Sequence, residues 1–132
     1  MKKYLVISIM VFIIGMLVSC ASPGSIRRDG IAFTYTTTKG TPQDFGRCLV
    51  TQLDERLPSL VHILRDNPDG NTTIISYAGG EEIHFVFDIN KEVIGLNILV
   101  YFSWCNGEVC RANLLFPDIN ASLNDCGANE KK

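Results

Sequence analysis

The 132-residue sequence contains few of the residues from which catalytic, metal-binding or nucleic-acid-binding sites are built. Its only histidines, His62 and His84, stand far apart in separate apolar runs, whereas a tight zinc site needs clustered ligands. No serine lies in a Gly-x-Ser-x-Gly turn, and no glycine-rich phosphate loop is present. Beyond the first few residues, Arg27-Arg28 is the only adjacent basic pair before Lys131-Lys132, and nucleic-acid binding relies on clustered cations. We therefore expect no cofactor, no metal ion, no nucleic-acid partner and no enzymatic activity.

One fragment of a metal-binding pattern is present. Asp88, Asn90 and Glu92 place three oxygen ligands at alternate positions, as in part of a calcium-binding loop. The glycine and the closing acidic residue of such a loop are missing in register. Polar residues of this kind are also favoured in turns, so we interpret the segment as part of a hairpin.

The N-terminus has the composition of an export signal. Lys2 and Lys3 precede an apolar run from Leu5 to Val18, which is broken only by Ser8 and Gly15. A short apolar run after two cations is typical of a secretory signal peptide. The run is shorter than the ~20 apolar residues that a comfortable membrane-spanning helix needs.

The apolar run ends in Leu17-Val18-Ser19-Cys20, which resembles the lipobox of bacterial lipoproteins. The resemblance covers residues 1–20. It implies cleavage between Ser19 and Cys20, a diacylglyceryl group on the Cys20 sulfur and a fatty acyl group such as palmitate on the new amine. Two or more acyl chains anchor a protein stably, whereas one holds it only marginally. The alternative is an ordinary cleaved signal, with Cys20 as a fifth structural cysteine.

The residue after the cysteine bears on location. In Gram-negative lipoproteins an aspartate there is a signal for retention in the inner membrane, so Ala21 implies, by resemblance, an outer-membrane address. We expect the periplasmic face of the outer membrane, with the inner membrane and the cell surface as alternatives. Loss of Lys2 and Lys3 with the signal takes the formal net charge from −2 to −4.

The rest of the chain is long enough for one domain. We expect a signal peptide at residues 1–19 and the lipidated cysteine with a flexible tether at residues 20–30. A single globular domain would follow at residues 31–127 and a polar tail at residues 128–132. Small residues, proline and glycine after Cys20 favour an irregular tether, which would let the domain stand off the membrane.

Alternating apolar residues predict strands at 31–36, 83–89 and 94–102, the last of them at the sheet centre. The β-branched segment 72–77 favours another strand. It follows the turn sequence Asn67-Pro68-Asp69-Gly70, which predicts a hairpin. Before that turn, the segment 59–65 is compatible with a strand or a short helix.

A helix is predicted over 42–57, because Thr41 is a good cap, Pro42 suits the first helical position and Pro58 ends the segment. One face of this helix is apolar and holds Phe45, Cys48, Leu49, Leu53 and Leu57.

At the C-terminal end we expect a strand from Cys110 to about Phe116, and then a short helix from Pro117 that Gly127 stops. The predicted fold is α+β, with one main helix packed on an antiparallel β-meander of about four to five strands. A short C-terminal helix and disulfides complete it.

Four cysteines remain besides Cys20, and an exported domain would sit in an oxidising compartment. Three pairings are open. We prefer Cys105 with Cys110, which bracket a turn containing Asn106-Gly107, and Cys48 with Cys126, which would join the helix to the C-terminal segment. The functional alternative is a redox pair at Cys105 and Cys110. Redox motifs usually place two residues between the cysteines, so we favour a structural bridge.

We expect a lipid-anchored, non-enzymatic binding or envelope-assembly factor with a protein partner in the envelope. The candidate binding surface is an exposed strand edge or the aromatic segment from Tyr101 to Trp104. The alternative is a periplasmic enzyme inhibitor that presents the loop between Cys105 and Cys110, or a small enzyme in which His84 meets a carboxylate.

Overall fold

The computed structural model of the chain describes residues 23–29, 31–78, 83–102 and 111–132. None of the helices formed by these residues combines the length and the apolar composition that crossing a bilayer requires. The elements follow one another as α2 (Pro23–Asp29), β1 (Ile31–Thr37), α3 (Pro42–Arg56), β2 (Leu60–Asp66), β3 (Thr72–Ala78), β4 (Ile83–Lys91), β5 (Leu96–Phe102), α4 (Arg111–Asp125) and β6 (Asn129–Glu130).

The described strands form one antiparallel sheet in the order β2-β3-β4-β5-β1-β6. The α+β class and the antiparallel sheet are thus confirmed. Strands β2 to β5 are the predicted meander of sequential neighbours. The first strand, β1, lies beyond β5, with Ile31 opposite Phe102, and the two-residue β6 extends the sheet past it.

Local signals placed α3 correctly. The Thr41 hydroxyl accepts a hydrogen bond from the Asp44 amide at 3.2 Å, and Pro42 occupies the first turn. At the other end, the Leu57 amide donates to the Leu53 carbonyl at 2.7 Å, just before Pro58. The helix therefore begins and ends where its capping residues predict.

The segment 59–65, which the sequence left open, forms β2. It pairs with β3 through the predicted turn, in which the Asn67 amide donates to the Asn71 carbonyl at 2.8 Å. Gly70 has a φ of 86°, a conformation that residues with a Cβ rarely adopt.

The expected strand up to Phe116 is wrong, because residues 111–125 form the single helix α4 with Pro117 inside it. Leu115, Ile119 and Leu123 recur every four residues, and this helical face packs onto the core. The apolar run before Pro117 suggested a strand, but burial of the whole face offsets the backbone hydrogen bond that proline removes. Gly127 ends the helix as predicted, with a φ of 90°.

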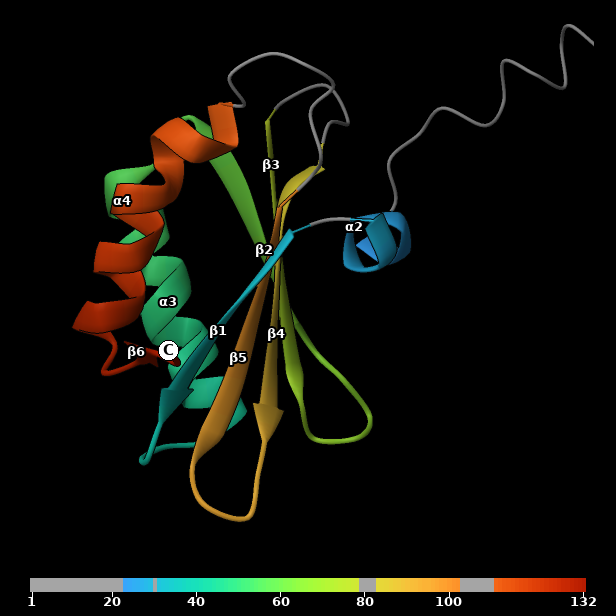
Figure 1. The fold of residues 1–132 in the computed structure, drawn as a ribbon, viewed down its shortest axis with the longest axis vertical. Coiled ribbons are helices and arrows are strands. Elements are labelled where there is room, and N and C mark those ends of the chain that lie inside the picture. The colour runs from blue at the N-terminus through green and yellow to red at the C-terminus, as the bar shows by residue number, and fades with distance from the viewer. Residues whose placement is uncertain (1–22, 30, 79–82, 103–110) are drawn as a thin grey trace, which may run out of the picture.

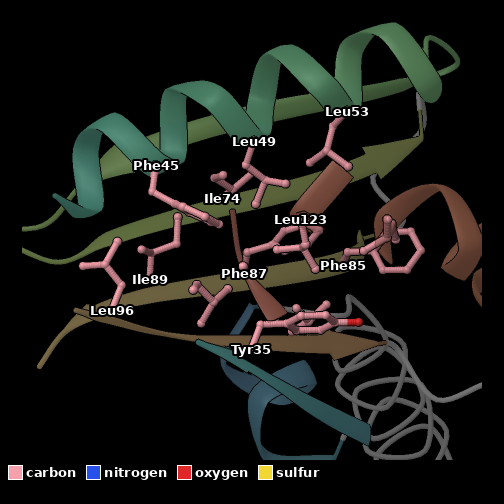
Figure 2. Packing of buried hydrophobic residues seen from close by; sticks show 14 of the residues in the cluster. Tyr35, Phe45, Leu49, Leu53, Ile74, Phe85, Phe87, Ile89, Leu96 and Leu123 are labelled. Carbon is pink, nitrogen blue, oxygen red and sulfur yellow. The ribbon is translucent and has the colours of Figure 1, made fainter. Parts of the chain in front are cut away.

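The core lies between one face of the sheet and the pair of helices α3 and α4 (Figure 1). Large apolar side chains from the helices and from the central strands meet in this layer (Figure 2). Its fully buried members include Leu49, Leu53, Leu123, Phe85, Phe87, Ile89, Ile98 and Tyr35. Tyr35 also donates a hydrogen bond to the Asn120 side chain at 3.0 Å, which joins β1 to α4. Burial raises the pKa of its hydroxyl to about 12.

The packed unit extends beyond the expected limits of 31–127 at both ends. Residues 23–29, expected within a flexible tether, form α2, and Ile26 is only 3% exposed. At the other end, the expected tail contributes β6, and the Lys131 amide donates to the Thr34 carbonyl at 2.8 Å. Cys20 and the remaining tether positions 21, 22 and 30 lie outside the described residues.

Candidate partner-binding surfaces

The sheet has a second face, which we call the outer face, on the side opposite α3 and α4 (Figure 1). Successive side chains of a strand point to opposite faces, so the side chains that do not enter the core lie on the outer face. Examples are the cross-strand pairs Thr73–Asp88 and Val86–Tyr101. Among the described elements, only the short helix α2 lies on this side, over β4 and β5. Thr73, Ile75 and Val86, in the middle of this face, are buried, and its other described side chains are half-buried or exposed.

An ion pair fixes α2 to the outer face. The Arg27 guanidinium donates two hydrogen bonds to the Asp88 carboxylate, at 2.6 Å and 2.5 Å, and Asp88 is only 17% exposed. The Thr73 hydroxyl donates to the same carboxylate at 3.0 Å. The hydrogen bond and the charge of Asp88 raise the pKa of Arg27. The Asp88 carboxylate, which belongs to the calcium-loop fragment, is thus already paired with the Arg27 guanidinium.

Tyr101, a candidate partner-binding residue, lies on the outer face beside α2. It is half-buried and stands opposite Val86 and Ala32 in the neighbouring strands. Burial raises the pKa of its hydroxyl, and the nearby charge of Asp88 raises it further. Part of this side chain is therefore covered by the fold.

Several predicted site residues lie outside the described residues. Cys20, Trp104, Cys105 and Cys110 are among them, and for His84 only the backbone in β4 is described. The lipid attachment, the Cys105–Cys110 bridge, the aromatic anchor at Trp104 and any role of His84 stay predictions.

Strand β2 forms one end of the sheet. Among the described strands it pairs only with β3, so its other edge keeps unpaired backbone donors and acceptors. Its outward-facing Val61 is 46% exposed, and Ile63 is half-buried. The strand contains no proline, and its charges, Arg65 and Asp66, come only at its end. An edge of this kind can accept a further strand.

The Cys48–Cys126 disulfide is confirmed. Its sulfur atoms are 2.00 Å apart and its Cα atoms 5.9 Å apart. It connects the middle of α3 to the segment after α4, across 78 positions of sequence. The disulfide therefore links α3 covalently to the residue that follows α4. The Arg56–Asp125 ion pair makes a second link, between α3 and the end of α4.

An open cavity of about 520 Å³ lies beside this disulfide. Its lining combines the loop before α3 with the start of α3 and the turn after α4, and consists of residues 37–40, Asp44, Phe45, Cys48, Cys126 and Gly127. Its charged lining residues are one cation, Lys39, and one anion, Asp44. Because these charges are opposite, the lining does not favour a ligand of either charge.

His62, which is half-buried, and Ser76, which is buried, form a polar pair that the sequence did not reveal. His62 Nδ1 lies 2.7 Å from Ser76 Oγ, and Nε2 lies 3.4 Å from the Leu57 carbonyl oxygen. Burial lowers the pKa of His62, against the opposing effects of the Leu57 carbonyl and the Asp54 charge. A neutral imidazole suits this position, with Nε2–H facing the carbonyl and Nδ1 accepting from the serine. Ser76 is fully buried, so its hydroxyl does not face solvent as a nucleophile would.

Among the described residues, no group of three or more histidine, cysteine, aspartate or glutamate side chains is placed to hold a metal ion. Comparison with known proteins finds no matching family model, no matching curated protein and no matching solved structure. The surfaces of the fold itself therefore supply the argument about function.

Proposed function

We propose that the mature protein is a lipid-anchored, non-enzymatic binding or envelope-assembly factor on the periplasmic face of the outer membrane. The lipobox-like sequence ending at Cys20 supports the anchor. The Cys48–Cys126 bridge supports an oxidising compartment, because disulfides persist in the periplasm and are rare in the cytosol.

The observation that carries the binding role is the free edge of β2. Seven residues of extended backbone present hydrogen-bonding groups, and α3 packs on this strand only from the core side. A partner segment that adds a strand here gains main-chain hydrogen bonds, while Val61 and Ile63 offer apolar contact on the outer face. The occupant is an extended segment of an envelope protein.

The test is a quantitative pull-down from membrane fractions with the tagged, lipidated protein, in which bound proteins are identified by mass spectrometry. Val61→Lys places a charge on the edge strand, and edge-strand lysines oppose strand addition. Val93→Lys is the matched control, because Val93 is fully exposed in the loop between β4 and β5. Cys20→Ser removes the anchor.

We expect a discrete envelope partner with the wild type and with Val93→Lys, and a several-fold loss with Val61→Lys and with Cys20→Ser. Equal recovery with Val61→Lys and the wild type would contradict docking at β2. In that case, loss of the partner with Trp104→Ala would move the binding surface to the segment from Tyr101 to Trp104. No partner from a protein confirmed to be lipidated would contradict the assembly role.

A further inference from the structure

The position of α2 limits how far the domain stands from its anchor. Pro23, the first residue of α2, follows Cys20 by three positions, so their Cα atoms lie at most about 11 Å apart whatever path the chain takes. Burial of Ile26 and the Arg27–Asp88 ion pair hold α2 on the sheet. A lipid on Cys20 therefore places the membrane close to α2, on the side of the outer face (Figure 1).

The charges of the two sides differ in sign. On the outer-face side, the described side chains of α2, β2 and β4 include the cations Arg27, Arg28 and Arg65 and the anion Asp88. Among the described side chains, the helix layer has the opposite excess: its acidic ones in α3 and α4 are Asp44, Asp54, Glu55, Asp118 and Asp125, and its basic ones are Arg47 and Arg56. For Arg111, at the start of α4, only the backbone is described. Anionic lipid headgroups attract the first side and repel the second.

Apolar and aromatic side chains lie on the same half of the outer face as Arg65. Val61 and Ile63 of β2 stand beside Tyr77 of β3, which is half-buried. Tyrosine is enriched at membrane interfaces, where its ring meets acyl chains and its hydroxyl meets water. At the opposite end of the outer face, β1 contributes Ala32 and two threonines, so this end has less apolar surface for contact with lipid.

We infer that the outer face, from α2 to β2, rests on the phospholipid headgroups of the membrane that holds Cys20. This inference rests on the proposed function, because it needs the lipid on Cys20, and it adds the orientation of the domain. The helix layer faces away from the membrane. The free edge of β2 is then held at the membrane surface, where it meets its partner.

The test uses the full lipidated protein in vesicles of phosphatidylethanolamine and phosphatidylglycerol, with a photo-crosslinking amino acid at one position. Position 61 reports on the outer face, and position 55 is the matched site, exposed on α3. We expect several-fold more lipid adduct from position 61. Arg65→Glu should lower that yield, whereas Arg47→Glu, an equal charge change on α3, should not.

Each outcome decides one question. The intact mass of the mature protein shows whether Cys20 carries lipid, and a mass without lipid would overturn the anchor and this orientation with it. Lipidated protein with equal adduct yields from positions 61 and 55 would overturn the orientation alone. It would leave the anchored binding factor in place.

Discussion

At the scale of single residues, the pair of His62 and Ser76 shows how a strand pairing creates a polar site. Neither residue stands in a recognisable motif, but the register of β2 with β3 sets them directly opposite each other. The buried Ser76 hydroxyl then needs a hydrogen-bond partner, and His62 supplies it. Once the hairpin register is known, such cross-strand pairs follow from it.

The lowered pKa of His62 predicts a dependence of stability on pH. Because burial depresses the folded pKa below the ordinary value of 6.5, the neutral form is favoured in the fold. Its contribution to stability is present above pH 6.5 and is lost as the pH falls through the folded pKa. Between pH 7.5 and pH 5.5, the free energy of unfolding measured in urea should fall more for the wild type than for His62→Gln. Equal decreases for the two proteins would contradict a lowered pKa of His62 in the fold.

Gly95 occupies a position where adding a single methyl group should lower the stability of the fold. It has a φ of 77°, and an added Cβ would lie 1.9 Å from the Thr37 carbonyl oxygen. Strained backbone and forced displacement each cost about 1–3 kcal/mol, so Gly95→Ala should lower the free energy of unfolding by at least about 2 kcal/mol. The measurement is denaturant unfolding.

Gly70→Ala is the control for Gly95, because Gly70 has a similar φ of 86° but no atom within 4 Å of an added Cβ. It should lose only the cost of the backbone conformation, about 1 kcal/mol. If both variants lost the same amount, the close approach to Thr37 would not be the cause.

At the scale of elements, the disulfide should be a large part of what holds the helix layer together. A bridge over a loop of this length contributes up to about 4.5 kcal/mol in the chain-entropy description, and strain usually reduces that figure. Replacing Cys48 and Cys126 together by alanine should therefore lower the free energy of unfolding by about 2–4 kcal/mol. Thermal and denaturant unfolding measure this.

The same double variant separates the two predicted bridges. If dithiothreitol lowers the stability of the wild type but not of the double variant, the Cys48–Cys126 bridge accounts for the whole effect. A further loss in the double variant would support the predicted bridge between Cys105 and Cys110. An unchanged wild type under reducing conditions would contradict a stabilising role for Cys48–Cys126.

Elements with local signals could be predicted from the sequence, and elements set by distant contacts could not. Thr41, Pro42 and Pro58 delimit α3, and the turn at Asn67–Gly70 fixes a hairpin, because these residues act on their own backbone. The helical course of α4 through Pro117 depends on a face that packs onto the sheet. Likewise, Gly24 and Ser25 suggested a tether, but burial of Ile26 stabilises α2.

The candidate surfaces divide in the same way. The sequence predicts an exposed strand edge as a binding surface, but the sheet order was needed to show that β2 is an edge strand among the described strands. Tyr101 was expected as a partner-binding residue, and only the packing of α2 reveals that it lies beside the Arg27–Asp88 pair. Both points depend on contacts between segments far apart in the chain.

At the scale of the whole molecule, the fold has two unequal sides. One side is a helix layer joined by a disulfide, and the other is a sheet face on which, of the elements that the structure describes, only the short helix α2 lies (Figure 1). The anchor position, three residues before α2, assigns the open side to the membrane in our proposal. The pull-down and the lipid crosslinking test the two halves of that proposal separately.

The placement of β1 also sets the order in which the domain can be completed. Strand β1 is made early, but both of its partners, β5 and β6, come from the C-terminal half of the chain. Contacts this distant form slowly, since a long loop must close before they are gained. Until β5 and β6 are available, β1 is an extended segment with both edges unpaired, which makes the incomplete domain prone to aggregation.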